Sequence, residues 1–360
     1  MKNMYKKIFV ITLFVMLFLP MTYIFGVKDN IFVYGSESIA ELPSMQEKSF
    51  TKHKFQPEFE NWWNTHFAFR NFMLKAKNQI YDWANFGVIH KGYFDNIIEG
   101  KNRYLFGKYL FKSVYKNCLP NPDFAKLETL NKYTKRHGIK IYFVLAPSKA
   151  RTYYDYLPIR YKWFLGKCPV HEQLASGIEY FGIPVYNTQP LMEKLRVDGE
   201  YQPFPIGGIH WNYYGAGMAV KESAKHFKWA PVEWFGVEKS KTPYFAEQDL
   251  TKLQNLFFKK RNDKRFYKPT MLASHRWHDK TIIIGDSYSN EYNYMLSNSG
   301  FSDDGMVIHY SNDPLDEKAV ENILSAKRII FVYTDDIIDP NHQFWKKLDM
   351  LVNRIEIIKK

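Results

Sequence analysis

A serine that follows a short apolar run is the best candidate nucleophile in this chain. The segment reads Thr281-Ile-Ile-Ile-Gly-Asp-Ser-Tyr-Ser289. Three consecutive isoleucines are typical of a buried parallel strand, and Gly285 permits a sharp turn where that strand ends. Ser287 is therefore expected beyond the carboxyl end of the strand, where open α/β sheets bind ligands. Asp286 is expected to hydrogen-bond the backbone of the turn, although Asp286 and Ser287 also suit a purely structural role as helix caps.

A serine hydroxyl needs a base to act as a nucleophile at neutral pH, and histidine is the usual one. Among the eleven histidines, His210 is the best placed, because it lies in a glycine-containing loop before a helix-like segment at residues 214–227. Its neighbour Trp211 supports an alternative in which His210 is a packed core residue. If a helix begins near Ser289, its backbone N–H groups would stabilise negative charge beside Ser287.

The serine and histidine segments together resemble the alginate O-acetyltransferase group, in which the histidine block precedes the serine block. Two further segments are similar to that family: Val144-Leu-Ala-Pro-Ser-Lys-Ala-Arg-Thr-Tyr-Tyr-Asp-Tyr-Leu-Pro158 and Phe59-Glu-Asn-Trp-Trp-Asn-Thr-His-Phe-Ala-Phe-Arg70. The likeness runs from about Phe55 to the end of the chain. It implies an SGNH-hydrolase-like domain that moves an acetyl group through a serine ester onto an exported polysaccharide. It also implies a multi-spanning membrane acyltransferase as the donor and no cofactor.

One position departs from the family pattern. Members with a full triad carry an aspartate two residues before the histidine, whereas this chain has Gly208 there. The carboxylate orients the imidazole and stabilises its charged form. Two substitutes remain open: a Ser287–His210 dyad oriented by a backbone carbonyl, or a carboxylate from elsewhere. Asp335 and Asp336, which follow an apolar run, are the candidates for the second.

Three more residues are predicted to contact the substrate from the same edge of the sheet. Lys149 follows a strand end and is expected either to meet an acidic sugar or acyl oxygen, or to lie on the surface over Tyr153. Tyr153 belongs to a tyrosine cluster that suits either sugar rings or the core. Tyr333 ends another strand beside the two aspartates.

The N-terminus predicts a membrane anchor. Residues Ile8 to Val27 are almost continuously apolar and follow Lys2, Lys6 and Lys7. About twenty such residues can span a bilayer, and no Ala-x-Ala-like cleavage site follows. The positive-inside rule places the remaining chain outside the cytoplasm, which in a bacterium means the periplasm or exterior. The expected division is an anchor at 1–27, a tether at 28–54 and an SGNH-hydrolase-like domain at 55–360.

Composition limits the partners. The net charge of +13 and the aromatic content of 18% suit anionic headgroups or an acidic polysaccharide, while export disfavours nucleic acid. No Cys/His spacing predicts a metal site. Cys118 and Cys168 are the two cysteines, and an oxidising compartment would allow them to pair.

Helical and strand-like segments alternate along the chain. This alternation predicts an α/β layered fold with a largely parallel central sheet. Expected helices cover residues 55–83, 123–137, 170–181, 215–227 and 316–325. Expected strands cover 139–145, 183–186, 281–284, 306–309 and 329–332, with a β-turn-β element at 94–106 and an irregular segment at 228–277.

Three functions are compatible with these residues. The first is an exported polysaccharide O-acetyltransferase that uses Ser287 and His210. The second is a carbohydrate esterase, in which water replaces the sugar acceptor. The third is a catalytically silent glycan-binding or scaffold protein, in which Gly208 marks the loss of the triad.

Overall fold

The computed structural model describes residues 2–35, 40–43, 55–84, 97–107, 122–162, 169–244, 246–258, 265–302, 306–309 and 317–358. Cys118, Cys168 and most of the basic run that begins at Lys259 lie outside these ranges. Contacts gather the chain into two compact units. One comprises Met1–Phe94 with Thr251–Lys260, and the other comprises Asp95–Leu250 with Arg261–Lys360. The predicted domain limits at residues 28 and 55 stay predictions.

The first unit is helical. Its helices are α1 (Lys2–Phe18), the 3₁₀ helix η1 (Pro20–Phe25), α3 (Phe55–His66) and α4 (Arg70–Trp83). The single helix expected at 55–83 is wrong, because Phe69 adopts a left-handed conformation with φ of 61° and separates α3 from α4.

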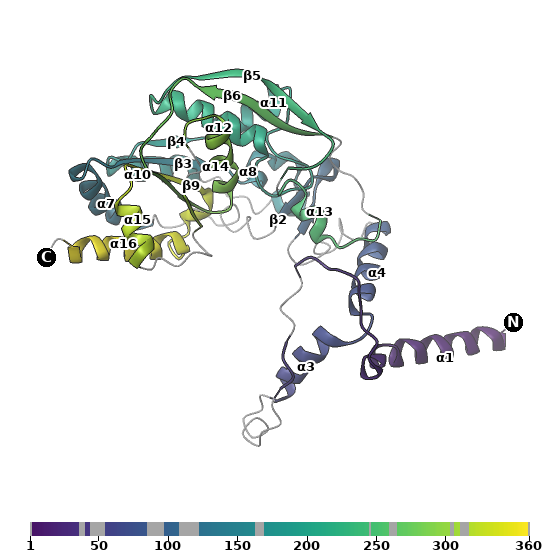
Figure 1. Ribbon diagram of the computed structural model, residues 1–360. Helices are drawn as coiled ribbons and strands as arrows, with labels where there is room; N and C mark the ends of the chain where they lie inside the picture. The colour runs from purple at the N-terminus through teal and green to yellow at the C-terminus, as the bar shows by residue number, and fades with distance from the viewer. Residues whose placement is uncertain are drawn as a thin grey trace. The chain divides into compact units, whose positions relative to one another are not determined.

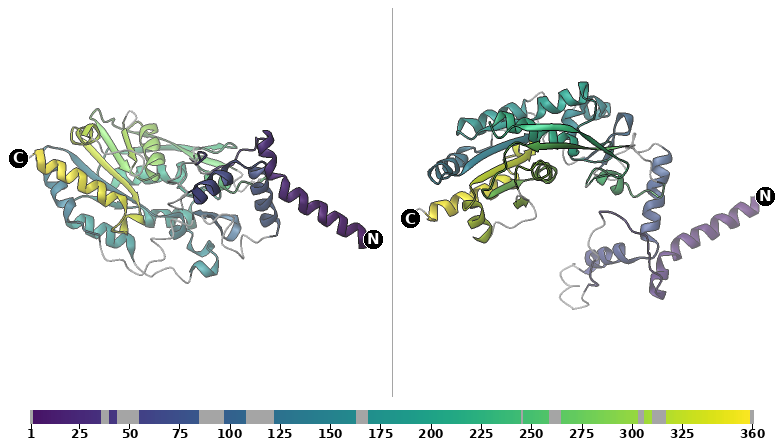
Figure 2. Two further views of the ribbon diagram at one scale, coloured as in Figure 1. Left: turned by 90° about the horizontal axis from the view of Figure 1, so that it is seen from below. Right: turned by 45° about the horizontal axis from the view of Figure 1, so that its top comes forward.

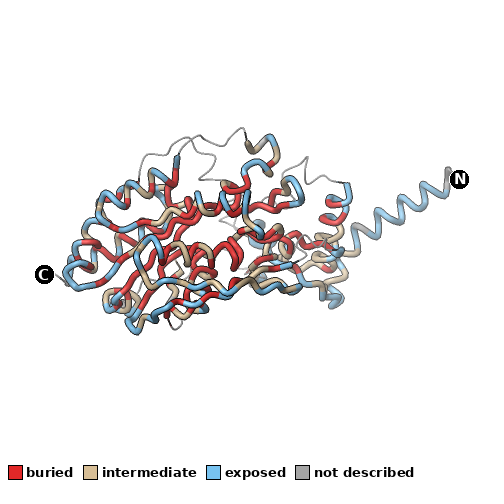
Figure 3. Tube along the Cα trace, turned by 90° about the horizontal axis from the view of Figure 1, so that it is seen from above, coloured by how far each residue is buried: buried red, intermediate tan, exposed pale blue. Residues whose placement is uncertain are grey.

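The apolar N-terminal stretch is also divided. Helix α1 ends at Phe18, and Pro20 is the first residue of η1, a position where the missing N–H of a proline costs no helical hydrogen bond. Residues 4–15, 17 and 18 of α1 are exposed (Figure 3). Within the described ranges, no helix combines the length and the apolar composition that crossing a membrane requires.

The second unit contains the predicted parallel sheet. Its five strands are ordered β4-β3-β9-β7-β8, and every neighbouring pair is parallel. Their bounds are β3 (Lys140–Ala146), β4 (Val185–Asn187), β7 (Thr281–Gly285), β8 (Met306–His309) and β9 (Arg328–Thr334). All five expected strands are confirmed within two residues at each end. The carboxyl ends of β3, β9 and β7 therefore meet at one edge.

Helices cover both faces of this sheet, which gives the three layers of an α/β fold (Figure 1). One face packs against α7 (Ala125–Arg136), α10 (Val170–Tyr180), α15 (Glu317–Leu324) and α16 (Gln343–Ile358). The other packs against α8 (Lys149–Thr152), α11 (Gln189–Asp198), α12 (Tyr213–His226) and α14 (Tyr288–Asn298). Other short helices are η4 (Tyr154–Tyr156), α9 (Ile159–Lys162), α13 (Asp249–Leu253) and η5 (Asp335–Ile338).

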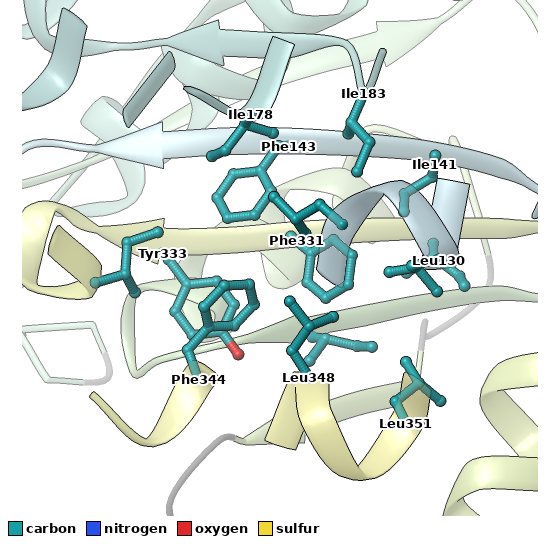
Figure 4. Packing of buried hydrophobic residues seen from close by; sticks show 14 of the residues in the cluster. Leu130, Ile141, Phe143, Ile178, Ile183, Phe331, Tyr333, Phe344, Leu348 and Leu351 are labelled. Carbon is teal, nitrogen blue, oxygen red and sulfur yellow. The ribbon is translucent and has the colours of Figure 1, made fainter. Parts of the chain in front are cut away.

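Successive strand residues alternate between the two faces, as the period of a β-strand requires. Phe143 and Phe331 lie in the core under α16, where they stack and contact Phe344 (Figure 4). Val144 and Val332, one position further along, lie in the core under α12 and α14. Because the sheet is buried on both sides, its position is fixed against both helical layers.

Residues 228–277, expected to be irregular, contain an antiparallel strand pair instead. Strands β5 (Val232–Ser240) and β6 (Phe266–Ala273) pair with a bulge near Gly236 and pack over α12 (Figure 2). Pro269 lies within β6, and a proline inside such a run argues against a strand when only the sequence is known. The small element β1 (Ile97–Glu99), η2 (Lys101–Arg103) and β2 (Leu105–Gly107) confirms the predicted β-turn-β.

Candidate active site

Ser287 lies where the sequence pattern predicts, between the end of β7 and the start of α14. The turn is tight at Gly285, where a Cβ atom would lie 2.3 Å from the carbonyl oxygen of Val332 and 2.5 Å from the Cβ of Ser289. Only glycine fits between β7 and β9 at this point. The requirement for glycine holds the strand end against β9 and so fixes the position of Ser287.

Asp286 anchors the same turn. Its Oδ1 accepts a hydrogen bond from the N–H of Tyr288 at 2.9 Å, and its Oδ2 accepts bonds from the N–H and hydroxyl of Thr334 at 2.7 and 2.8 Å. Burial raises the pKa of Asp286 to about 6, against the lowering effect of these donors. The carboxyl group thus ties the serine turn to the end of β9, as expected of a structural residue in the turn.

His210 lies within hydrogen-bond distance of Ser287. Its Nε2 is 2.7 Å from the Ser287 Oγ, although the two residues are 77 positions apart in the chain. Two hydrogen bonds of Tyr288 keep the His210 segment beside the Ser287 segment. The Trp211 Nε1 donates to the Tyr288 carbonyl at 3.1 Å, and the Tyr288 hydroxyl donates to the Ile209 carbonyl at 2.9 Å. Trp211 is buried and stacks on Tyr292, so Trp211 belongs to the core that supports the site, while the His210 side chain is 13% exposed.

A carboxylate that the sequence did not identify lies behind the histidine. The Asp249 Oδ2 is 3.4 Å from the His210 Nδ1, a distance that is within reach of an ion pair but outside good hydrogen-bond geometry. Such contacts are often long in unliganded sites. The other oxygen, Oδ1, accepts bonds from the N–H groups of Ile209 and Leu250 at 3.0 and 2.6 Å. Ser287, His210 and Asp249 are therefore arranged in the order of a catalytic triad.

The packing around Gly208 explains why the carboxylate comes from a different segment. A Cβ atom at Gly208 would lie 2.8 Å from the carbonyl oxygen of Glu247 and 2.9 Å from that of Ala246. The backbone that precedes Asp249 thus occupies the space that an aspartate at position 208 would need. The glycine and the displaced carboxylate are two parts of one local arrangement.

Asp335 and Asp336, the predicted donors of a replacement carboxylate, do not take that role. Asp335 is fully buried, and its oxygens accept bonds from the N–H of Ser148 at 3.2 Å and from the Arg151 Nε at 2.7 Å. Asp336 follows it in η5. Among the described residues, the carboxylate within 4 Å of His210 belongs to Asp249. Asp335 instead joins the end of β9 to α8.

Lys149 is a buried residue, so neither predicted surface role fits. It is 1% exposed, and its Nζ donates to the carbonyl oxygens of Pro205, Ile206 and Gly208 at 2.5, 3.0 and 2.7 Å. The ammonium group also lies 5.1 Å from the ring centroid of Tyr104. Three carbonyls of one loop therefore converge on a single cation, which fixes the segment that leads to His210.

The two predicted substrate tyrosines are core residues. Tyr153 is fully buried, its hydroxyl donates to the Gln202 Oε1 at 2.7 Å, and burial raises its pKa. Tyr333 is 1% exposed and packs against Phe143 and Phe344. For Tyr153 the core alternative is therefore the one that holds. Tyr333 lies at a strand end as predicted, but alternation along β9 points its side chain into the core.

The electrostatic setting favours a neutral imidazole. Burial, with a smaller contribution from the positive form of His309, lowers the pKa of His210 to about 4. His309 ends β8 and pairs with Gly285 in the sheet. Burial also raises the pKa of Glu291, four residues after Ser287, well above its ordinary value. At neutral pH, His210 is thus available as a base.

The first amides of α14 are partly occupied. The N–H of Tyr288 donates to Asp286 Oδ1, and that of Ser289 donates to the Asp286 carbonyl at 3.0 Å. In the described part of the chain, the N–H of Ser287 donates to no protein acceptor. Among described residues, no group of three or more His, Cys, Asp or Glu side chains is arranged to hold a metal ion.

Comparison with known proteins gives structural neighbours only. No family model matches the chain, and no curated protein matches it. The O-acetyltransferase domain of Pseudomonas putida AlgJ is 17% identical with a TM-score of 0.48, covering 72% of this chain and 99% of that one. AlgX of Pseudomonas aeruginosa is 16% identical with a TM-score of 0.44, covering 66% of this chain, which spans 61% of AlgX. PatB1 of Bacillus cereus is 11% identical with a TM-score of 0.42, covering 69% of this chain and 98% of that one.

Proposed function

We propose that this protein is a serine-dependent O-acetyltransferase that acts on hydroxyl groups of an exported polysaccharide. The observation that carries the proposal is the 2.7 Å contact between the Ser287 Oγ and the His210 Nε2, with Asp249 on the far side of the ring. Both Ser287 and His210 are partly buried, and a neutral imidazole that lies between a serine hydroxyl and a carboxylate is the arrangement that activates a serine. Acyl transfer is the chemistry that such an arrangement performs.

The reaction proceeds in two steps, acetylation of Ser287 and transfer of the acetyl group to the sugar. In the first, the Ser287 Oγ attacks the carbonyl carbon of an acetyl donor while His210 Nε2 takes the hydroxyl proton. The donor oxygen then leaves with that proton, and an acetyl ester remains on Ser287. In the second step, a sugar hydroxyl attacks the ester, and its proton passes to His210 and back to the Ser287 oxygen. Asp249 stabilises the imidazolium that forms in each step.

The oxyanion of each step would form beside the start of α14. The Ser287 N–H is a candidate donor, because it has no protein acceptor among the described residues, and the positive end of the α14 dipole points to the same place. The amides of Tyr288 and Ser289 are less suitable, since both already donate to Asp286. This modifies the expectation that several free amides of the helix would hold the charge.

Asp249 bears directly on the silent-binder alternative. That alternative depended on Gly208 as a mark of a lost triad, whereas a carboxylate reaches the same imidazole nitrogen from another segment. The esterase alternative uses the same three residues with water as the acceptor. The two enzymes differ only in how the second step is completed.

Acceptor partition separates the two enzymes. The full chain is incubated with p-nitrophenyl acetate, first alone and then with acidic or neutral oligosaccharides. We expect an acetyl mass on the peptide that contains Ser287, and transfer of that acetyl group to an oligosaccharide measured by mass spectrometry. Acetate that is released at the same rate with every oligosaccharide present would favour the esterase. The absence of any adduct and any turnover would favour the silent binder.

The proposal also includes export and attachment to the membrane, with a membrane-bound acyltransferase as the acetyl donor. The support comes from the apolar residues Ile8 to Val27 and the preceding lysines. The large apolar side chains of α1, such as Phe9 and Ile11, are also exposed, and such a surface is usually covered by lipid or another chain.

Cell fractionation tests this location. In a bacterial host, we expect the full chain in the membrane fraction, with residues after the N-terminal stretch digested by protease added to spheroplasts. A variant with Phe9→Lys and Ile11→Lys should leave the membrane fraction. Lys194→Glu, a change at an exposed position of α11, should not alter the fractionation. A wild-type chain that stays protected in intact spheroplasts would contradict export.

A further inference from the structure

A basic, aromatic pocket lies at the edge of the sheet opposite the candidate active site. It has a volume of about 450 Å³, which lies in the range of small-molecule sites. Its walls come from the starts of β3 and β9, the residues after α12, and the segment before β7. They are Lys140, Tyr142, Lys228, Trp229, Ala230, His275, Arg276, Trp277, His278, Asp279 and Arg328.

The parallel sheet separates this pocket from Ser287. The pocket includes residues at the amino ends of the strands, whereas Ser287 follows the carboxyl end of β7. Five residues of extended strand at about 3.3 Å each span about 17 Å. The pocket is therefore a different site from the one that holds His210 and Asp249.

Charge in the pocket is strongly biased. Four of its side chains are Lys or Arg, two more are histidines, and Asp279 is the one carboxylate that lines it. A concave surface with one sign of charge attracts ligands of the opposite sign. The expected ligand is therefore an anion.

Two nitrogen donors in the wall have no protein acceptor among the described residues. Arg328 is 5% exposed; its Nη1 donates to the Thr281 hydroxyl at 3.2 Å, while its buried Nε has no partner. The buried Nε1 of Trp229 likewise has none. A buried donor that stays unsatisfied destabilises the protein, so oxygen atoms of a ligand that accept from these two nitrogens would be bound favourably.

Aromatic rings hold the donors in place. The Arg328 guanidinium lies 3.7 Å from the ring centroid of Trp277, and Trp277 packs edge-on against Trp229 at 4.9 Å. The Trp277 N–H also donates to the Phe301 carbonyl at 2.6 Å, which anchors the segment that carries the ring. The Trp and Tyr rings of the wall suit the apolar C–H face of a ligand, and the Arg328 guanidinium beside them suits an acidic group on the same ligand.

We propose that this pocket binds an anionic sugar residue of the polysaccharide, one that carries a carboxylate or a phosphate. The acidic group would lie against Arg328 and the lysines, and the sugar ring against the aromatic wall. Because the pocket is remote from Ser287, it would hold the polymer chain and not the hydroxyl that is acetylated. The inference rests on the proposed function for the identity of the polymer, but the pocket's ligand class follows from its own residues.

Equilibrium binding to the full chain tests the pocket. Three probes are titrated by calorimetry: oligogalacturonate as an anionic sugar, maltohexaose of similar length as a neutral sugar, and inorganic phosphate as an anion without a sugar. The Ser287→Ala chain is used so that no acyl transfer occurs. We expect oligogalacturonate to bind at least tenfold more tightly than either other probe. Equal binding of maltohexaose would overturn the role of charge. Equal binding of phosphate would overturn the role of the sugar ring. A phosphate-bearing oligosaccharide that binds more tightly than oligogalacturonate would identify phosphate as the acidic group and would support the proposal.

Charge-reversal variants locate the binding. Lys140→Glu with Lys228→Glu changes two exposed side chains of the pocket and leaves buried Arg328 in place, so the fold should be kept. We expect at least tenfold weaker binding of oligogalacturonate. Lys194→Glu with Lys318→Glu, exposed lysines on α11 and α15, makes the same change in net charge and should weaken binding less than threefold. Equal weakening of binding in the two double variants would overturn the inference. The proposed function is tested separately, by acetylation of Ser287 in the wild-type chain.

Discussion

Ser287→Ala is expected to reduce acyl transfer by roughly 10⁴–10⁶-fold, since removal of the nucleophile from a working triad has effects of this size. The Oγ is the atom that forms the ester, and alanine has nothing to replace it. His210→Ala should have a comparable effect, because residues that act as one unit are not additive. The measurement is the rate of p-nitrophenol release together with the mass of the Ser287 peptide.

The fold should survive this change. The Ser287 hydroxyl bonds to His210, whereas the backbone turn is held by Asp286 and Gly285, which the variant keeps. The unfolding temperature should therefore match that of the wild type. Ser176→Ala, the same change on the exposed face of α10, serves as the matched control and should retain full activity. An adduct that forms at another residue in Ser287→Ala would show that the nucleophile has been misassigned.

The sequence allowed the Ser287–His210 pair to be predicted because each residue sits in a local pattern with a physical meaning. A triple-isoleucine strand that ends in glycine fixes where Ser287 lies, and a glycine-rich loop before a helix fixes His210. The parallel sheet was predictable for the same reason: its strands are short apolar runs between amphipathic helices. What brings the two segments together, such as the Trp211–Tyr288 bond, depends on long-range packing.

Asp249 was not predictable from a pattern. It lies 39 positions after His210, at the start of the short helix α13, and an aspartate there looks like an ordinary helix-start residue. Its role depends on how the chain around residues 246–247 fills the space beside Gly208. The role of Lys149 was not predictable for a related reason, because a strand-end lysine gives no local sign that three carbonyls will surround it.

Asp249→Asn is expected to lower kcat for acyl transfer by about 10²–10⁴-fold with little change in KM. The substitution keeps the fold, because the amide oxygen can still accept the bonds from the Ile209 and Leu250 N–H groups that Oδ1 now accepts. The amide nitrogen then faces the His210 Nδ1 in place of Oδ2. Two donors cannot bond to each other, so the ring is driven to the tautomer with its proton on Nε2, which cannot accept the Ser287 proton.

The pH profile distinguishes this positioning role from a general loss of structure. His210 must be neutral to act as a base, and its pKa is lowered to about 4, so the wild-type rate should fall as pH drops through about 4 and stay level toward neutrality. Removal of the Asp249 charge destabilises the imidazolium further, so the midpoint of this acidic limb should move to lower pH. Rates are measured from pH 3.5 to 8, with far-UV circular dichroism at each pH to confirm folding. A merely structural role would lower the rate equally at every pH.

Two further variants make the Asp249 prediction strict. Asp198→Asn, at an exposed position at the end of α11, is the matched control and should keep the wild-type rate. Adding Gly208→Asp to Asp249→Asn places a carboxylate where the resembled family carries it, yet we expect no recovery. The new Cβ would lie 2.8 Å from the Glu247 carbonyl, so the loop must shift before the side chain fits.

If Asp249→Asn kept its rate within threefold of the wild type, or if Gly208→Asp restored it, the imidazole would be oriented by some other group. Ser287 and His210 would then work as a dyad, and the packing of Gly208 against the chain before Asp249 would have no part in the chemistry.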